Sequence, residues 1–171
     1  MEKQQIESQL NEETDQIISF VVGRENFGVL IREVKEVIRI REITRLPKAP
    51  DFVKGVINLR GDVIPVIDLR EKFSMEVEDY TDMTRVIVVE VDGKSIGMVV
   101  DSVSHVLRLS RDQIDPAPPL VGGLAGEYIK GVGKLDEKLI ILLNIERILS
   151  HEEKIELDQL QQEVAETAGV G

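Results

Sequence analysis

The chain of 171 residues contains two copies of one sequence pattern, and this duplication constrains the fold more than any other feature. Residues 27–31 align with residues 96–100, and residues 52–69 align with residues 128–145. The two blocks keep the same order in both halves, with glycines at equivalent positions. A connector rich in proline and glycine, residues 116–126, absorbs the difference in spacing. We therefore expect two copies of one structural unit.

Each copy has the pattern of a small β unit. Residues 16–22 and 84–91 open the copies as apolar strands, and the second strand ends at Asp92-Gly93, a strong hairpin signal. Short strands between turn signals predict two small antiparallel barrels, and a barrel of this size is marginal alone. The barrels should therefore pack together; the sequence leaves open whether they exchange strands. The expected boundaries are about 16–80 for the first barrel and about 84–148 for the second, within a domain spanning 15–150.

The two ends of the chain depart from the β pattern. Residues 1–14 are polar, and we expect them to be disordered. Apolar residues from Asn144 to about Val164 have helical spacing. Residues 151–171 are therefore expected to form a C-terminal helix with a frayed tail.

Charge and composition disfavour several classes of partner. The net charge of −11 repels phosphate backbones and anionic lipid, so nucleic-acid and membrane-surface binding are not expected. The absence of cysteine excludes disulfides and cysteine-ligated metals. The first residues carry no apolar signal segment, and the apolar runs are too short to cross a bilayer. We expect a cytoplasmic protein without direct membrane insertion.

Candidate catalytic groups are few and scattered. The two histidines, His105 and His151, do not form a spaced ligand pair. No spacing places Asp62, Asp68 and Asp101 together, so structural roles are favoured for these carboxylates. The glycines near residues 122–133 lack the context of a phosphate-binding loop, and no convergent polar pocket can be identified for a small molecule. The sequence thus predicts no catalytic residue, no metal and no cofactor.

The two copies differ most at one tight turn. Asn58-Leu59-Arg60-Gly61 in the first copy is matched by residues 134–137 (KLDE) in the second. A turn arginine can simply solubilise a surface, but arginine is also a frequent anchor at protein interfaces. Glu36 likewise has no charge-matched equivalent, because His105 occupies its position in the second copy. These differences indicate residues that have a functional role rather than a role in forming the fold.

Residues 52–70 (FVKGVINLRGDVIPVIDLR) resemble the signature of the CheW family of chemotaxis coupling proteins. The similarity extends from about Ile17 to Leu149. Further blocks fit the family in the same order: Phe27-Gly28, Val34-x-Glu36-Val37, Gly97-x-Val99-Val100-Asp101-x-Val103, Ile114-x-Pro116-Ala117-Pro118 and Leu142-x-Asn144-Ile145.

The resemblance implies a pair of five-stranded SH3-like barrels and a non-enzymatic adaptor. Members of the family couple the cytoplasmic tip of methyl-accepting chemoreceptors to the regulatory domain of the histidine kinase CheA. The isolated protein would be a monomer that assembles with the kinase head to tail in rings or arrays, recruited to the inner face of the membrane through receptors. The alternative is a regulatory CheW-like module of a kinase or other two-component protein, although the chain lacks an ATP-binding or phosphotransfer region.

The resemblance also assigns residues to each partner. The implied receptor-binding residues are Val34, Asn58, Arg60, Arg85 and Gly97; the implied kinase-binding residues are Glu36 and Val37; and Gly28, Gly55 and Gly131 are implied to be structural. Val34 matches Val103 in the second copy, so core packing is a rival interpretation for it. Gly97 matches Gly28, which favours a structural role there too.

Overall fold

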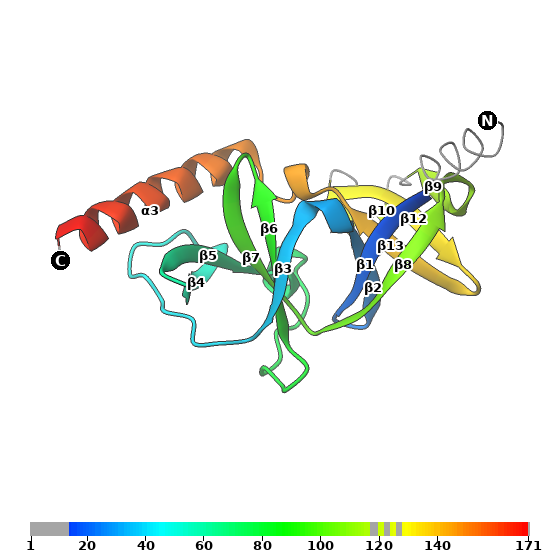
Figure 1. Cartoon of the computed structure of the whole chain (residues 1–171), viewed down its shortest axis with the longest axis horizontal. Helices are drawn as coiled ribbons and strands as arrows, with labels where there is room; N and C mark the ends of the chain where they lie inside the picture. The colour runs from blue at the N-terminus through cyan, green and yellow to red at the C-terminus, as the bar shows by residue number, and fades with distance from the viewer. Residues whose placement is uncertain (1–13, 117–119, 122–123, 126–127, 171) are drawn as a thin grey trace, which may run out of the picture.

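A computed structural model describes residues 14–116, 120–121, 124–125 and 128–170 (Figure 1). Apart from the two-residue strands β10 (Leu120–Val121) and β11 (Leu124–Ala125), the strands form two sheets. The other strands are β1 (Thr14–Val22), β2 (Glu25–Leu30), β3 (Val34–Arg39), β4 (Val53–Leu59), β5 (Asp62–Asp68), β6 (Arg85–Val91), β7 (Lys94–Val100), β8 (Ser102–Ser110), β9 (Ile114–Pro116), β12 (Ile129–Leu135) and β13 (Lys138–Leu143). The helices are α2 (Leu69–Lys72) and α3 (His151–Val170), and the 3-10 turns are η1 (Ile31–Glu33), η2 (Arg111–Gln113) and η4 (Ile145–Arg147).

Each sheet combines strands from both sequence copies. The six-stranded sheet has the order β8-β1-β2-β13-β12-β9, and the five-stranded sheet has the order β3-β6-β7-β5-β4. In both sheets a parallel pair joins strands of different copies, β2 with β13 and β5 with β7. The prediction of a mainly β fold with a C-terminal helix is confirmed.

The two expected five-stranded barrels take the form of two curled sheets. One sheet has six strands, and neither sheet is hydrogen-bonded into a closed barrel within the described residues. In the six-stranded sheet, the chain continues from β8 through η2 into β9, which pairs with β12 over three residues. In the five-stranded sheet, the chain after β3 reaches β4 only through the isolated bridge between Thr44 and Val56. The curled sheets are therefore completed by short segments at their open edges.

Two equivalent glycines permit this edge contact. A side chain at Gly55 would collide with the carbonyl oxygen of Thr44, and a Cβ at Gly131 would lie 2.8 Å from the carbonyl oxygen of Asp115. Contacts of this kind leave no room for a Cβ atom. The sequence blocks align these two glycines, so the duplication repeats the same close backbone approach in both sheets. Gly28 is also crowded, because a Cβ there would meet side chains of Ile17, Ile140 and Leu142.

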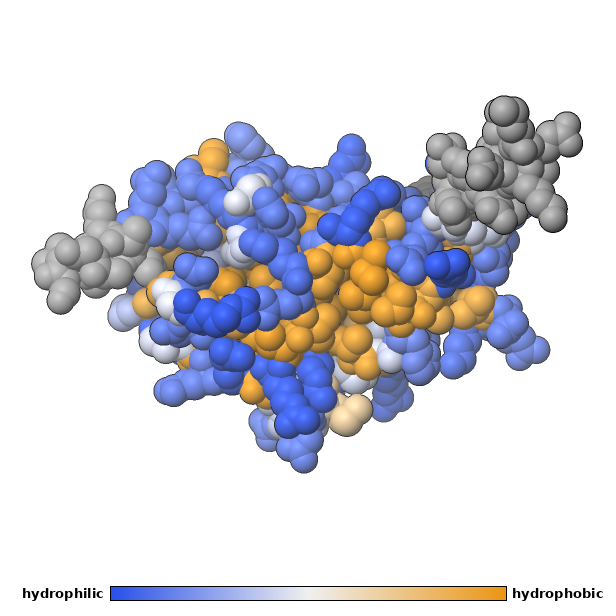
Figure 2. Space-filling view, in the orientation of Figure 1, coloured by the Kyte–Doolittle hydropathy of each residue, from blue (hydrophilic) through white to orange (hydrophobic). Residues whose placement is uncertain are grey.

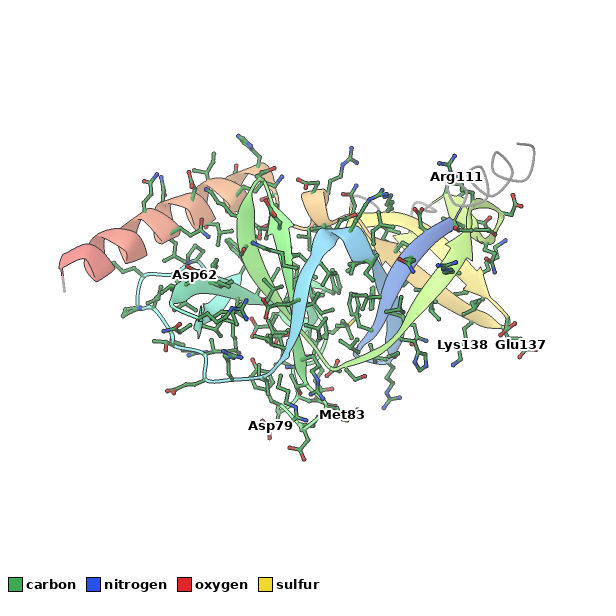
Figure 3. The ribbon with its side chains drawn as sticks, viewed as in Figure 1. Asp62, Asp79, Met83, Arg111, Glu137 and Lys138 are labelled. Atoms are coloured by element: carbon green, nitrogen blue, oxygen red, sulfur yellow. The ribbon has the colours of Figure 1, made fainter. Side chains whose placement is uncertain are left out.

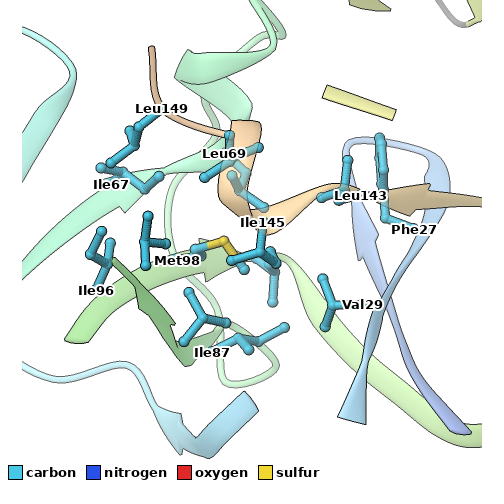
Figure 4. Close-up of a cluster of buried hydrophobic side chains, with 14 of the residues drawn as sticks. Phe27, Val29, Ile67, Leu69, Ile87, Ile96, Met98, Leu143, Ile145 and Leu149 are labelled. Carbon is cyan, nitrogen blue, oxygen red and sulfur yellow. The ribbon is translucent and has the colours of Figure 1, made fainter. Parts of the chain in front are cut away.

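The two sheets share one apolar core. Its largest cluster of buried side chains draws on both sheets, with Phe27, Val29 and Leu143 from one and Ile67, Ile87 and Met98 from the other (Figure 4). The rings of Phe20, Phe27 and Phe73 stack in series, with centroids 6.1 Å and 5.3 Å apart. Because burial of apolar surface drives folding, the shared core makes the two sheets one cooperative body.

Pro65 lies in β5, between β7 and β4, and pairs with Val56 of β4. The proline is tolerated because the parallel pairing with β7 starts one residue later, at Val66. Apolar residues have helical spacing from Asn144 onward, but residues 145–147 form η4 and α3 starts at His151. The helix starts there because Ser150 Oγ accepts from Glu153 N–H, while Glu153 Oε1 accepts from Ser150 N–H.

Within the described part of the chain, no helix combines the length and the hydrophobicity needed to cross a bilayer.

Candidate protein-binding site

The hairpin between β4 and β5 presents Arg60 at its tip. Leu59 pairs with Asp62, so Arg60 and Gly61 form a two-residue turn, and both have positive φ angles, 53° and 92°. This is the backbone of a type I′ hairpin turn, whose twist suits the flanking strands. Asn58 supports the turn, because its Oδ1 accepts a hydrogen bond of 2.9 Å from Gly61 N–H. Asn58 therefore positions Arg60, which projects with 71% of its side chain exposed.

Arg60 forms a two-bond ion pair with Glu36 of β3. Its Nη1 donates to Glu36 Oε1 at 3.1 Å, and its Nη2 donates to Oε2. The hydrogen bond from Arg60 lowers the pKa of Glu36, and the same interaction raises the pKa of Arg60. The pair links β3 to the β4–β5 hairpin, and β3 and β4 are the two edge strands of the five-stranded sheet. The structure thus joins one residue implied in receptor binding with one implied in kinase binding.

Exposed apolar side chains lie on β3, next to Glu36 in the sequence, and on β8 of the other sheet. Val37 on β3 is 37% exposed, and Val34 is half-buried against the shared core. Val106 on β8 is 55% exposed. Figure 2 shows a broad apolar area over the middle of this face, where β1, β3 and β8 lie in Figure 1. Val106 was not among the predicted site residues, although the alignment of the two copies matches it to Val37.

The remaining predicted receptor residues are less accessible. Arg85 starts β6, and its Nη1 donates to the carbonyl oxygens of Asp82 at 2.7 Å and Thr84 at 2.9 Å. Gly97 is buried within β7, where a Cβ atom would lie 2.8 Å from Val86 Cγ1. The structure therefore places Val37 and Arg60 at the surface and Gly97 inside the sheet.

The carboxylates considered for catalysis have structural partners. Asp68 and Asp101, which no spacing in the sequence brings together, both bond the guanidinium of Arg70. Asp62 lies apart, at the β4–β5 hairpin, and both histidines are exposed. Across the described residues, histidine and carboxylate side chains form no cluster of three that could hold a metal ion. An exposed arginine and exposed apolar side chains fit a protein contact better than a reaction.

Comparison with known proteins identifies the family of the chain. Residues 16–153 match the family model of the CheW-like domain. The chemotaxis protein CheW of Klebsiella aerogenes is 43% identical over 145 residues, which cover 85% of this chain and 87% of that protein. The CheW protein of Helicobacter pylori is 34% identical over 139 residues, which cover 81% of this chain and 84% of that protein.

A solved structure shows the same architecture. The crystal structure of the scaffolding protein TtCheW from Thermoanaerobacter tengcongensis superposes with a TM-score of 0.76 at 33% identity, covering 81% of this chain and 96% of that one. These matches extend over most of the chain, and a scaffolding role requires no catalytic site. The chain therefore belongs to the CheW-like family and is a non-enzymatic scaffold of chemotaxis signalling.

Proposed function

We propose that the protein couples the cytoplasmic tips of methyl-accepting chemoreceptors to the regulatory domain of the histidine kinase CheA. The observation that carries this proposal is the exposed Arg60–Glu36 pair on the five-stranded sheet of a chain that belongs to the CheW-like family. One ion pair then connects the surfaces implied for both partners. The receptors would recruit the protein to the inner face of the membrane.

The proposed receptor surface consists of Val34, Asn58 and Arg60, together with the exposed Val106. An exposed arginine and exposed aliphatic side chains are the kinds of residue expected at the centre of a protein interface. Asn58 would act by holding the turn that presents Arg60. Gly97 would act indirectly, because it is buried and could affect receptor binding only through the packing of β7 against β6. Arg85 would order residues 82–84 by its two bonds to their carbonyl oxygens.

Glu36 and Val37 would form the proposed kinase surface. They are adjacent on β3, an edge strand, and Glu36 already holds Arg60. Binding of the kinase near Glu36 would therefore compete with, or reorient, the arginine on the receptor side. This gives the adaptor a direct physical route between its two partners.

Assembly into rings or arrays would use the two ends of the molecule. Val63 beside the β4–β5 hairpin is 40% exposed, and Leu139 beside the β12–β13 hairpin is 61% exposed. Asp62 and Lys138, which neighbour these residues, lie at opposite ends in Figure 3. Exposed apolar residues at both ends suit head-to-tail contacts, which close into rings or extend into arrays. An isolated copy has no second molecule to satisfy them, and we expect it to be a monomer at low concentration.

The proposal is tested with Arg60→Glu, which places two carboxylates opposite each other. We expect binding to a receptor-tip fragment to weaken by about tenfold or more, because an exposed anchor is lost and like charges repel. Titration calorimetry with that fragment and with the kinase regulatory domain measures the effect. Arg111→Glu is the matched control, because Arg111 is an exposed arginine in η2, between two strands of the other sheet.

The charge-swapped variant Glu36→Arg/Arg60→Glu separates the effect of losing the ion pair from the effect of losing a direct contact between Arg60 and the receptor. It should restore the fold of the hairpin but not receptor binding, if Arg60 itself touches the receptor. Unchanged binding of both partners by Arg60→Glu would remove Arg60 from the site and leave the proposal without its main support.

A further inference from the structure

A buried ion network lies at one junction between the two sheets. Arg70 of α2 is 2% exposed and Asp68 is 1% exposed, and Arg70 Nε and Nη2 donate to the two oxygens of Asp68 at 3.1 Å and 3.0 Å. Arg70 Nη1 also donates to the carbonyl oxygen of Glu78 at 2.8 Å. The guanidinium therefore ties β5 and α2 to the loop that leads to β6.

Asp101 extends this network to the other sheet. It stands between β7 of the five-stranded sheet and β8 of the six-stranded sheet. Its Oδ1 accepts from Arg70 Nη1 at 3.4 Å, while its Oδ2 accepts from Gly23 N–H, in the β1–β2 turn, at 2.7 Å. Its own N–H donates to the carbonyl oxygen of Val21 at 2.9 Å. A single residue thus bonds groups that belong to both sheets.

The duplicated junction on the opposite side lacks this network. Arg32 and Glu146 occupy the positions equivalent to Asp101 and Arg70, with the charges reversed. Although the structure describes both residues, no ion pair joins them. Asp92, which is equivalent to Gly23, instead pairs with Lys154 of α3 at 3.2 Å. The duplicated fold therefore forms without this ion network. The network at one junction must serve a purpose other than forming the fold.

Hydrogen bonds and ion pairs can fix an orientation that apolar packing alone leaves undetermined. The shared core holds the sheets together, but hydrophobic attraction has no preferred direction. Charge-assisted hydrogen bonds require defined distances and angles, and in a buried site they select one arrangement. A bonded carboxylate at the point where the chain crosses between sheets is suited to that task.

We propose that Asp101 is a positioning residue that fixes the relative orientation of the two sheets, and with it the relative orientation of the two ends of the scaffold. The consequence for assembly rests on the proposed function, because a scaffold must present both ends at one angle to join two partners in one complex. The orientation itself can be measured without any partner.

The chain contains no cysteine, so spin labels can be attached at chosen sites without background. Cysteines at Asp62 and Lys138, both exposed and at opposite ends of the molecule in Figure 3, report the distance between the two sheets by pulsed electron resonance. The label pair is measured in the otherwise unchanged chain, in Asp101→Ala, and in Asp115→Ala. The last variant is a matched control, because Asp115 pairs with Lys134 at 2.5 Å within the six-stranded sheet alone.

We expect a narrow distance distribution in the unchanged chain and in Asp115→Ala, and at least about a two-fold broader one in Asp101→Ala. The side chain of Asp101 is 30% exposed, so water can replace it and the variant should fold. Asp101→Asn, which keeps one acceptor, should broaden the distribution less and serves if the alanine variant is unstable. A distribution as narrow in both Asp101 variants as in the control would overturn the proposal.

Assembly supplies the second readout. Asp101→Ala should bind the receptor-tip fragment and the kinase regulatory domain singly as the unchanged chain does, but form several-fold less of the three-component complex. Normal formation of that complex by a variant with a broadened distribution would refute the link between orientation and scaffolding. If the unchanged chain itself binds neither partner, the proposed function fails while the distance measurement still decides the role of Asp101.

Discussion

At the scale of single residues, Arg60 is unusual for its backbone. Equivalent turn positions in two other hairpins, Asp92 and Asp136, have φ angles of 50° and 55°, and Arg60 has 53°. Aspartate tolerates this left-handed region because its short side chain can bond to the nearby backbone, whereas the long side chain of arginine gives no such local compensation. A long cationic residue in a strained turn is therefore explained better by recognition than by folding.

The fold should accept glycine in place of this arginine. In Arg60→Gly the turn loses its strain together with an exposed ion pair of small net value, so the urea midpoint should change little. Binding to the receptor-tip fragment should fall as it does in Arg60→Glu. Chemical denaturation and calorimetry on one preparation check both parts, with Asp136→Gly as the control that should change neither. A large loss of stability in Arg60→Gly would assign Arg60 a structural role instead.

The pair with Arg60 should also be visible in the titration of Glu36. The pKa of Glu36 is lowered from its ordinary value of 4.5 by the hydrogen bond from Arg60. A lowered pKa means that the pair stabilises the fold above pH 4.5 and that this contribution is lost as the pH falls through the lowered pKa. Carboxyl NMR should show the pKa of Glu36 returning toward 4.5 in Arg60→Gly. An identical titration in both proteins would mean that the pair does not persist in solution.

At the scale of elements, helix α3 packs against the five-stranded sheet. Most of its residues lie beyond the part of the chain that matches the family. The match ends at residue 153, yet Leu157 and Leu160 are buried in the shared core. Ion pairs tie the helix to the β6–β7 hairpin through Lys154 with Asp92 and Lys94 with Asp158, and to α2 through Glu153 with Lys72. Figure 1 shows α3 running along the side of the molecule that carries β5, β6 and β7. The first turns of α3 are therefore part of the folded body.

Truncating the buried leucines tests this attachment. Leu157→Ala and Leu160→Ala should each lower the free energy of unfolding by about 2–5 kcal/mol if α3 unfolds together with the sheets. Ile155→Ala, at a position that is 47% exposed on the same helix, should cost no more than about 0.5 kcal/mol. Thermal and urea denaturation measure all three. Equal small effects would show that α3 detaches before the sheets unfold.

At the scale of the whole molecule, neither sequence copy builds a sheet of its own. The first copy supplies β1 and β2 to the six-stranded sheet and β3, β4 and β5 to the other, and the second copy supplies the rest. Parallel pairs at the centre of both sheets therefore link distant parts of the chain. The stability of either half depends on the other.

Separated halves should fold only together. Fragments 1–82 and 83–171 should each give the circular dichroism of an unfolded chain, because each lacks strands from both sheets. Mixing them in equal amounts should restore β structure and a cooperative thermal transition. Independent folding of either fragment would contradict the shared core.

The candidate site was only partly predictable for a physical reason. Arg60 and Glu36 could be identified because they break the match between the copies, but their ion pair spans the open edge of a curled sheet. No local sequence pattern shows that these two residues lie close together. Gly97 shows the opposite limit, since its motif was visible but its burial between β6 and β5 required the structure. Val106 was available from the alignment with Val37, although its exposure was not.

The sequence by itself determined the duplication, the strands and hairpins, the C-terminal helix and the family. These properties depend on local periodicity, turn residues and the order of motifs, all of which are written along the chain. Only the tertiary structure decided that both sheets mix the two copies, that the barrels stay open, and that Asp68, Arg70 and Asp101 meet between the sheets. Those outcomes depend on contacts between residues distant in sequence, where apolar burial and a few directional bonds select one arrangement from several that share the same local pattern.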